Sequence, residues 1–121
     1  MSFRFIDSKL SGMLILMTEE EKNGIWAELE KKSPDLIKAF LSLKNEDELK
    51  AFFRDLMSER DLREFAMRWE VAKKLYAGMP FTQIQEETGE SPVTITKINR
   101  WLKEGCGGYK LMIERLRGEE K

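Results

Sequence analysis

The apolar positions of this chain recur at spacings of three and four residues, which place side chains on one face of an α-helix. The longest such stripe runs between Glu59 and Ala77 and stops before Gly78. Its members are Leu62, Phe65, Ala66, Trp69, Ala72, Leu75 and Tyr76. No comparable run alternates between apolar and polar residues with a period of two, as a half-buried strand would. The pattern predicts an all-α chain, with this stripe in its core.

Short polar segments predict where the helices begin. Each places a Ser, Thr or Asn where its side chain can accept a hydrogen bond from a free N–H group of the first turn. The segments are "TEEE" (18–21), "SPDL" (33–36), "NEDE" (45–48) and "SERD" (58–61). Pro34 suits the first helical position, which needs no N–H donor, and acidic residues suit the positive end of the helix dipole. The regular helical pattern therefore starts at Thr18.

The predicted helices upstream of Ser58 are short but rich in large apolar side chains. A chain of this length has too little surface of its own to cover them easily, which favours burial against a partner chain. The residues concerned are Trp26, Leu29, Leu36, Ile37, Phe40, Leu41, Leu43, Leu49, Phe52, Phe53 and Leu56.

A helix–turn–helix is predicted at about residues 81–103. Phe81, Ile84 and Thr88 fall on one side of a short helix. This helix is expected to end at Gly89, because glycine adopts the left-handed conformation that other residues resist. A three-residue turn would then fix a second helix at a steep angle, so that the outer face of that helix can enter a major groove.

The second helix has one apolar face and one polar face. Ser91 is expected to cap it and Pro92 to occupy its first position. The buried face is predicted to contain Ile95, Ile98 and Leu102, and the outer face Val93, Thr96, Lys97, Arg100 and Lys103. From this local pattern alone, an ordinary helical hairpin with a solvated charged face is as good an interpretation as a DNA-binding unit.

The charge of the chain favours DNA only locally. The net charge is −1, yet from residue 92 to residue 121 seven Lys and Arg stand against four Glu. This excess is small and predicts modest, salt-sensitive affinity unless two copies act together. Lys97 and Thr96 are expected to read base edges, and the methyl groups of Val93 and Thr96 suit contact with a thymine methyl group. Phosphate contacts are expected from Ser91, Arg100 and Lys103.

Composition excludes several classes of function. The chain of 121 residues has no His and a single Cys, Cys106, which removes most metal sites, His-based acid–base catalysis and an intrachain disulfide. A cytoplasmic setting fits, and the run "MLILM" (13–17) is too short to span a membrane. We expect one domain, residues 18–121, after an extension of residues 1–17 that is disordered or an over-extended start. We expect no enzymatic activity.

Residues 36–116 contain longer motifs with a specific resemblance. These are "LSLKNEDELKAFFRDLMSERDLREFAMRWEVAKKLYAG", "IQEETGESPVTITKINRWL" and "GCGGYKLMIERL". Through them the chain resembles the Trp repressor-like superfamily and, more closely, its YerC/YecD branch. The resemblance implies an all-helical fold with a helix–turn–helix, an intertwined homodimer and binding of double-stranded DNA through one recognition helix per subunit.

The resemblance also raises the question of a tryptophan corepressor. In the Trp repressor, one arginine on the long helix and another early in the recognition helix hold tryptophan beside a glycine. Arg68 matches the first arginine, Lys97 replaces the second, Ile98 replaces the glycine, and Ser58 matches a polar residue at the pocket rim. Lys lacks the planar guanidinium fork, and Ile fills space that an indole needs. Tryptophan is therefore not expected as a cofactor, and an ion pair with Glu64 explains Arg68 equally well.

The sequence favours a homodimeric, sequence-specific DNA-binding transcriptional regulator. The alternative is a helical protein–protein interaction module that has lost DNA binding, which the near-zero net charge keeps open.

Overall fold

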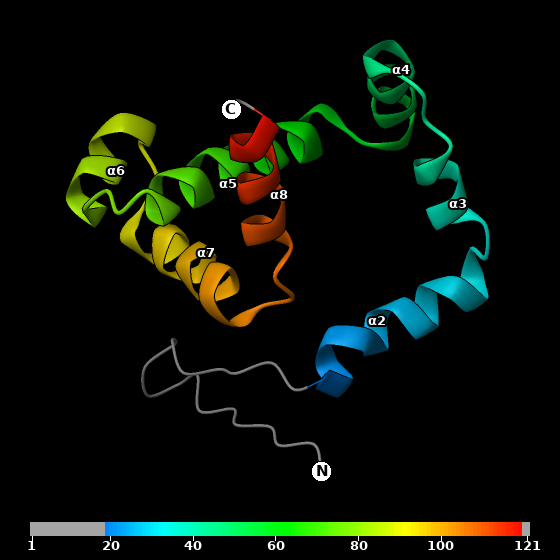
Figure 1. Cartoon of the computed structure of the whole chain (residues 1–121), viewed down its shortest axis with the longest axis horizontal. Coiled ribbons are helices and arrows are strands. Elements are labelled where there is room, and N and C mark those ends of the chain that lie inside the picture. Colours follow the sequence, from blue (N-terminus) through cyan, green and yellow to red (C-terminus); the bar gives the residue numbers. More distant parts are fainter. Residues whose placement is uncertain (1–18, 120–121) are drawn as a thin grey trace.

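The computed structural model describes residues 19–119, and every regular element in this range is a helix (Figure 1). The all-α prediction is confirmed for these residues. None of their helices combines the length and apolar character needed to cross a membrane. The predicted extension of residues 1–17 and the predicted cap at Thr18 lie outside this range. The helices are α2 (Glu19–Lys32), α3 (Leu36–Leu41), α4 (Glu46–Leu56), α5 (Glu59–Tyr76), α6 (Phe81–Thr88), α7 (Pro92–Glu104) and α8 (Gly108–Glu119).

Side-chain caps start α4 and α5 where the sequence predicts them. The Asn45 side chain accepts a hydrogen bond from the Glu48 N–H at 2.9 Å. Ser58 Oγ accepts one from the Asp61 N–H at 3.1 Å, and the Asp61 carboxylate accepts one from the Ser58 N–H at 3.1 Å. This reciprocal pair is a capping box, which satisfies two otherwise free donors at the start of α5.

The predicted helix start at Ser33 and Pro34 is wrong by two residues. Helix α3 begins at Leu36, after Asp35, and has no side-chain cap. The Leu36 N–H instead donates to the Ser33 carbonyl oxygen at 3.2 Å. Ser33 to Leu36 therefore form a turn, and Pro34 occupies the second position of that turn, where its fixed φ angle is favoured.

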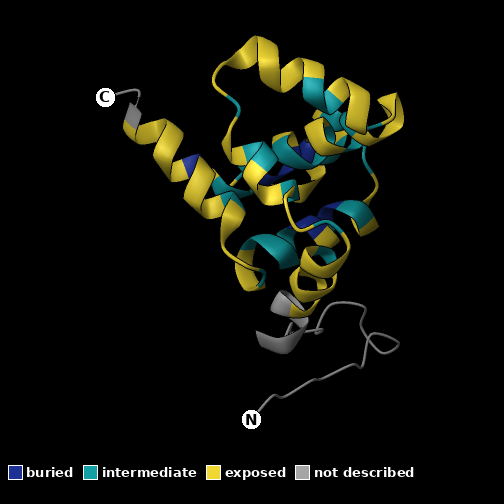
Figure 2. Ribbon diagram, turned by 90° about the vertical axis from the view of Figure 1, so that its right-hand side faces the viewer, coloured by how far each residue is buried: buried dark blue, intermediate teal, exposed yellow. Residues whose placement is uncertain are grey.

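Helix α5 is the centre of the packed part of the chain, which we call the core and define as α5 to α8. Helices α6, α7 and α8 all pack against α5 (Figures 1 and 2). Polar contacts reinforce two of these junctions. Lys74 pairs with Glu87 at 3.2 Å, and the Tyr76 hydroxyl donates to the Glu114 carboxylate. The fully or almost fully buried residues are Val71, Ala72, Ile84, Ile95, Ile98 and Ile113.

Helices α2, α3 and α4 form an arm that extends away from the core (Figure 1). Within residues 19–119, α4 is the helix of the arm that packs closely against α5. Inside the arm, the Phe40 ring lies 5.6 Å and 5.8 Å from the rings of Phe52 and Phe53. No residue of α3 or α4 is buried, and Leu41 is 80% exposed. Of the eleven apolar residues that the sequence places upstream of Ser58, five are exposed and six are half-buried in this single chain.

Candidate nucleic-acid interface

Local hydrogen bonds build the predicted turn between α6 and α7. Gly89 ends α6 with a φ angle of +77°, in the left-handed region, and its N–H donates to the Gln85 carbonyl at 2.8 Å. The Thr88 hydroxyl donates to the Ile84 carbonyl at 2.7 Å and accepts the Glu90 N–H at 3.1 Å. The turn from α6 to α7 is thereby fixed within a few residues.

The start of α7 also matches its prediction. Ser91 Oγ accepts the Thr94 N–H at 3.2 Å and lies 3.2 Å from Thr94 Oγ1, to which it donates. Pro92 is the first helical residue. On the inner face, Ile95 and Ile98 have 0% and 1% of their surface exposed. The Ser91 hydroxyl is engaged in holding α7 together, so its own bonds limit what it can offer to a phosphate.

The outer face of α7 is largely open, as the sequence predicts. Val93 is 64% exposed, although large apolar side chains are normally covered. Lys97 and Lys103 are exposed, and Thr96 is half-buried. An apolar methyl surface flanked by ammonium groups is the combination that major-groove recognition uses. These residues lie on the outer face of α7, a helix of the core that packs against α5.

Arg100 differs from the expectation of an outward guanidinium. The residue is half-buried, and its Nε and Nη2 atoms have no solvent contact and no hydrogen-bond partner among the described residues. A long arginine side chain can fold its stem and head against neighbouring surface instead of extending from the helix. In this conformation, the guanidinium of Arg100 has fewer N–H groups available for a phosphate than the sequence predicts.

Two of the three residues considered for an effector pocket border one cavity. Arg68 from α5 and Lys97 from α7 both line a space of about 330 Å³, together with Glu64, Met67, Glu90, Thr94, Ile98 and Trp101. Ser58 is not among these residues, because it caps the far end of α5. Ile98 is buried, in keeping with a side chain that fills space beside Lys97. The cavity wall carries carboxylates as well as cations.

Trp101 is the residue of this region that the sequence reasoning missed. The Arg68 guanidinium carbon lies 5.0 Å from the centre of the Trp101 ring, and Arg68 Nη2 pairs with Glu64 Oε2 at 2.6 Å. The ion pair between Arg68 and Glu64 is thus confirmed, but it is only half of the arrangement. The available signal was the spacing of Trp101, three residues after Ile98, which puts an aromatic ring at the edge of the inner face of α7.

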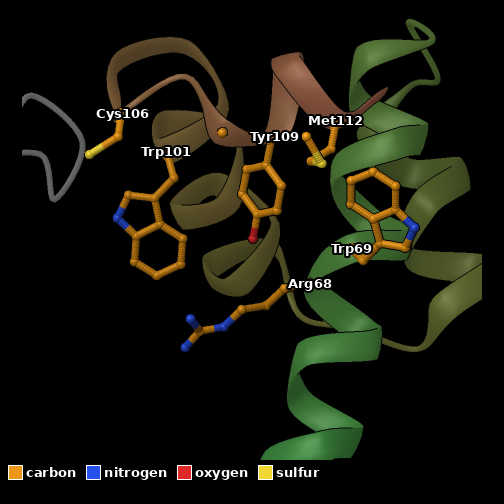
Figure 3. Close-up of a pocket in the computed structure, with 8 residues that line it drawn as sticks. Arg68, Trp69, Trp101, Cys106, Tyr109 and Met112 are labelled. Atoms are coloured by element: carbon orange, nitrogen blue, oxygen red, sulfur yellow. The ribbon is translucent and has the colours of Figure 1, made fainter. Parts of the chain in front are cut away.

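A second, larger cavity shares Arg68 and Trp101 with the first. It has a volume of about 620 Å³ and is bordered by Arg68, Trp101 and residues of α5, α8 and the loop before α8 (Figure 3). Burial raises the pKa of Tyr109 above its ordinary value, and the nearby Arg68 opposes that shift. The remaining lining residues are Trp69, Gly105, Cys106, Gly108, Tyr109 and Met112. This cavity is mainly aromatic and aliphatic.

Comparisons with known proteins agree with this architecture. A family model described as Trp repressor protein matches residues 31–117. The uncharacterized protein YerC of Bacillus subtilis (strain 168) is 34% identical over 90 residues, which make up 74% of this chain and 86% of YerC. Its sequence likeness therefore extends over nearly the whole of that relative.

Solved structures give the same result. The structure of a TrpR like protein from Eubacterium eligens ATCC 27750 has 37% sequence identity and a TM-score of 0.68, and the match covers 74% of this chain and 94% of that one. A structure from Staphylococcus aureus has 30% identity and a TM-score of 0.66 over the same shares. Since the family model spans α3, α4 and nearly all of the core, with the helix–turn–helix in it, this chain belongs to the Trp repressor protein family, in the branch that contains YerC.

Proposed function

We propose that this protein is a sequence-specific DNA-binding transcriptional regulator that acts as a homodimer. The observation that carries the proposal is the helix–turn–helix, in which a left-handed Gly89 ends α6 and a capped α7 exposes Lys97 and Lys103 on its outer face. Membership of the Trp repressor protein family, which is not a family of enzymes, supports the same function.

Within this proposal, α7 is the recognition helix. Lys97 and Thr96 contact base edges, and Val93 contacts thymine methyl groups, because these side chains lie on its outer face. Lys103 contacts phosphate, and Ser91 and Pro92 set the start of the helix against the backbone of the duplex. Arg100 joins the phosphate contacts only after its side chain turns outward.

Homodimer formation is part of the proposal because one chain leaves its arm uncovered. Ile25, Trp26, Leu49 and Leu56 are each more than two-fifths exposed, and α8 exposes Leu111 and Leu116 to a similar extent. The arm of a second copy would cover the exposed apolar residues of α8, and the core of that copy would cover the arm of the first. Two recognition helices would then read half-sites about one helical turn apart, ~34–36 Å.

The first experiment is selection of genomic DNA fragments by the purified full-length protein at moderate salt, with and without L-tryptophan. We expect recovery of a pseudo-palindromic site under both conditions, since Lys97 stands where tryptophan would need a planar guanidinium fork. Recovery only with tryptophan would contradict the proposed lack of a corepressor. Recovery of nothing under either condition would count against DNA binding.

A charge-matched pair of variants tests the interface. Lys97→Ala with Lys103→Ala should weaken affinity for the selected site about tenfold or more, because base and phosphate contacts are lost together. Lys38→Ala with Lys44→Ala removes the same charge from exposed positions on the arm and should have little effect. Equal affinities of the two double variants would rule out α7 as the DNA-reading element.

The second candidate function is a helical protein–protein interaction module. The specific observation in its favour is that Glu64 and Glu90 share the cavity wall with Arg68 and Lys97, so that anionic groups lie close to the proposed DNA surface. DNA affinity that stays undetectable even at low salt, where counterion release favours binding most, would support this candidate.

A further inference from the structure

Trp101 is the large side chain through which the C-terminal half of α7 reaches α5. The buried contacts of Ile95 and Ile98 hold the N-terminal half of α7 and its middle. Trp101 stands farther along and lines both cavities, of about 330 Å³ and about 620 Å³. Its indole therefore lines both spaces, and Figure 3 shows it in the wall of the larger one with Arg68 and Tyr109.

Arg68 holds this indole from the opposite helix. Its guanidinium lies over the Trp101 ring at 5.0 Å, while its Nη2 atom donates to Glu64 at 2.6 Å. A guanidinium bonds in its own plane and stacks through its face, so both contacts form at once. Glu64 and Arg68 are one turn apart on α5, and this pairing limits the rotamers of the arginine. The result is a bridge from α5 to α7 made only of this chain's own side chains.

We propose that Trp101 is a positioning residue that sets the orientation of the recognition helix, so that DNA reading needs no small aromatic ligand. This inference rests on the proposed function. Without the indole, the two cavities would merge, and α7 would have room to tilt on its inner face. Without this contact, α7 would spend part of its time in orientations that do not fit DNA. The apparent affinity for DNA falls in proportion to the fraction of molecules that have α7 in the DNA-binding orientation.

The test uses the full-length protein and its Trp101→Ala variant, with indole as the probe. Removing the half-buried indole leaves a space beside Arg68 that a small apolar molecule of matching shape can fill. We expect hydrogen exchange of residues 92–104 in the variant to rise about tenfold or more, and added indole to restore most of the protection. Affinity for the selected DNA site should fall and recover in parallel with this protection.

Trp69→Ala is the matched control. Trp69 is also half-buried, borders the larger cavity and has a cation, the Lys73 Nζ atom, 5.6 Å from its ring centre, but it lies on α5. Its removal should leave the exchange of residues 92–104 unchanged. If Trp101→Ala does not fold, Trp101→Phe and Trp101→Leu replace it: the Phe ring should keep the protection of α7 and Leu should lose it, since only the ring presents a π face to Arg68.

Three results would overturn the inference. The exchange of α7 could remain unchanged in Trp101→Ala, it could rise equally in α5 and α7, or indole could fail to restore it. An equal rise would mean that Trp101 stabilises the core as a whole rather than positioning α7. Because the exchange measurements contain no DNA, loss of the proposed DNA-binding function would not affect them, and the two failures are distinguishable.

Discussion

At the scale of single residues, the turn of the helix–turn–helix depends on one backbone angle. Gly89 has a φ of +77°, whereas Gly24 lies inside α2 without a positive φ, and an added Cβ would meet nothing within 4 Å at either position. Gly89→Ala should therefore lower the free energy of unfolding by about 1 kcal/mol, and Gly24→Ala should raise it by about 0.5–1 kcal/mol. Chemical denaturation of both variants checks this, and changes of the same sign would contradict it.

Ser58 gives a second prediction at this scale. Because its side chain caps α5 and does not border the cavity of Arg68 and Lys97, Ser58→Ala should cost about 1 kcal/mol of stability. Ser58→Asp should recover most of the loss, since Asp is also a good cap. Denaturant titration measures both variants. A variant that changes DNA affinity while stability stays constant would instead place Ser58 at a functional pocket.

At the scale of elements, we expect the junction between α5 and α6 to be sensitive to acid. The hydrogen bond from Gln83, followed by the ion pair with Lys74, lowers the pKa of Glu87 below its ordinary value of 4.5. A lowered pKa means stability that is present above the ordinary value and is lost as pH falls through the folded-state value. Glu87→Gln should therefore lower the Tm at neutral pH, and the difference from the wild type should shrink in acid.

Melting curves between about pH 3 and 7 measure this difference, with Glu86→Gln as the control. Glu86 is the exposed neighbour of Glu87 and has no ion pair among the described residues. A Tm difference for Glu87→Gln that stays constant with pH would show that the ionised carboxylate does not support the junction.

The elements also show what could be read from the sequence. The helix–turn–helix was predictable because Gly89, Ser91 and Pro92 act on their immediate neighbours. The Ser33 segment was not, since the same residues suit a turn as well as a helix start. The bridge from Arg68 to Trp101 joins residues far apart in the chain, and the inward fold of Arg100 is a rotamer choice. Neither feature can be predicted from the residues that lie nearby in the sequence.

At the scale of the whole molecule, we expect one added charge on the exposed arm to disrupt the proposed homodimer. Leu41→Asp puts a carboxylate at an 80% exposed apolar position, where a partner chain would have to bury it. We expect this variant to be monomeric in analytical ultracentrifugation at concentrations where the wild type is a dimer. Lys44→Asp, at an exposed polar position nearby, should remain dimeric. A monomeric wild type would remove the dimer from the proposed function.

The order of arm and core along the chain has a consequence for synthesis. Helices α2 to α4 precede α5 to α8, so they leave the ribosome before the core of the same chain can fold and pair with a second copy. The nascent arm therefore carries exposed apolar side chains during the time needed to make the core, and its best protection in that interval is a chaperone that holds such segments. The yield of active protein should accordingly depend on chaperone supply and translation rate more than on the intrinsic stability of the core.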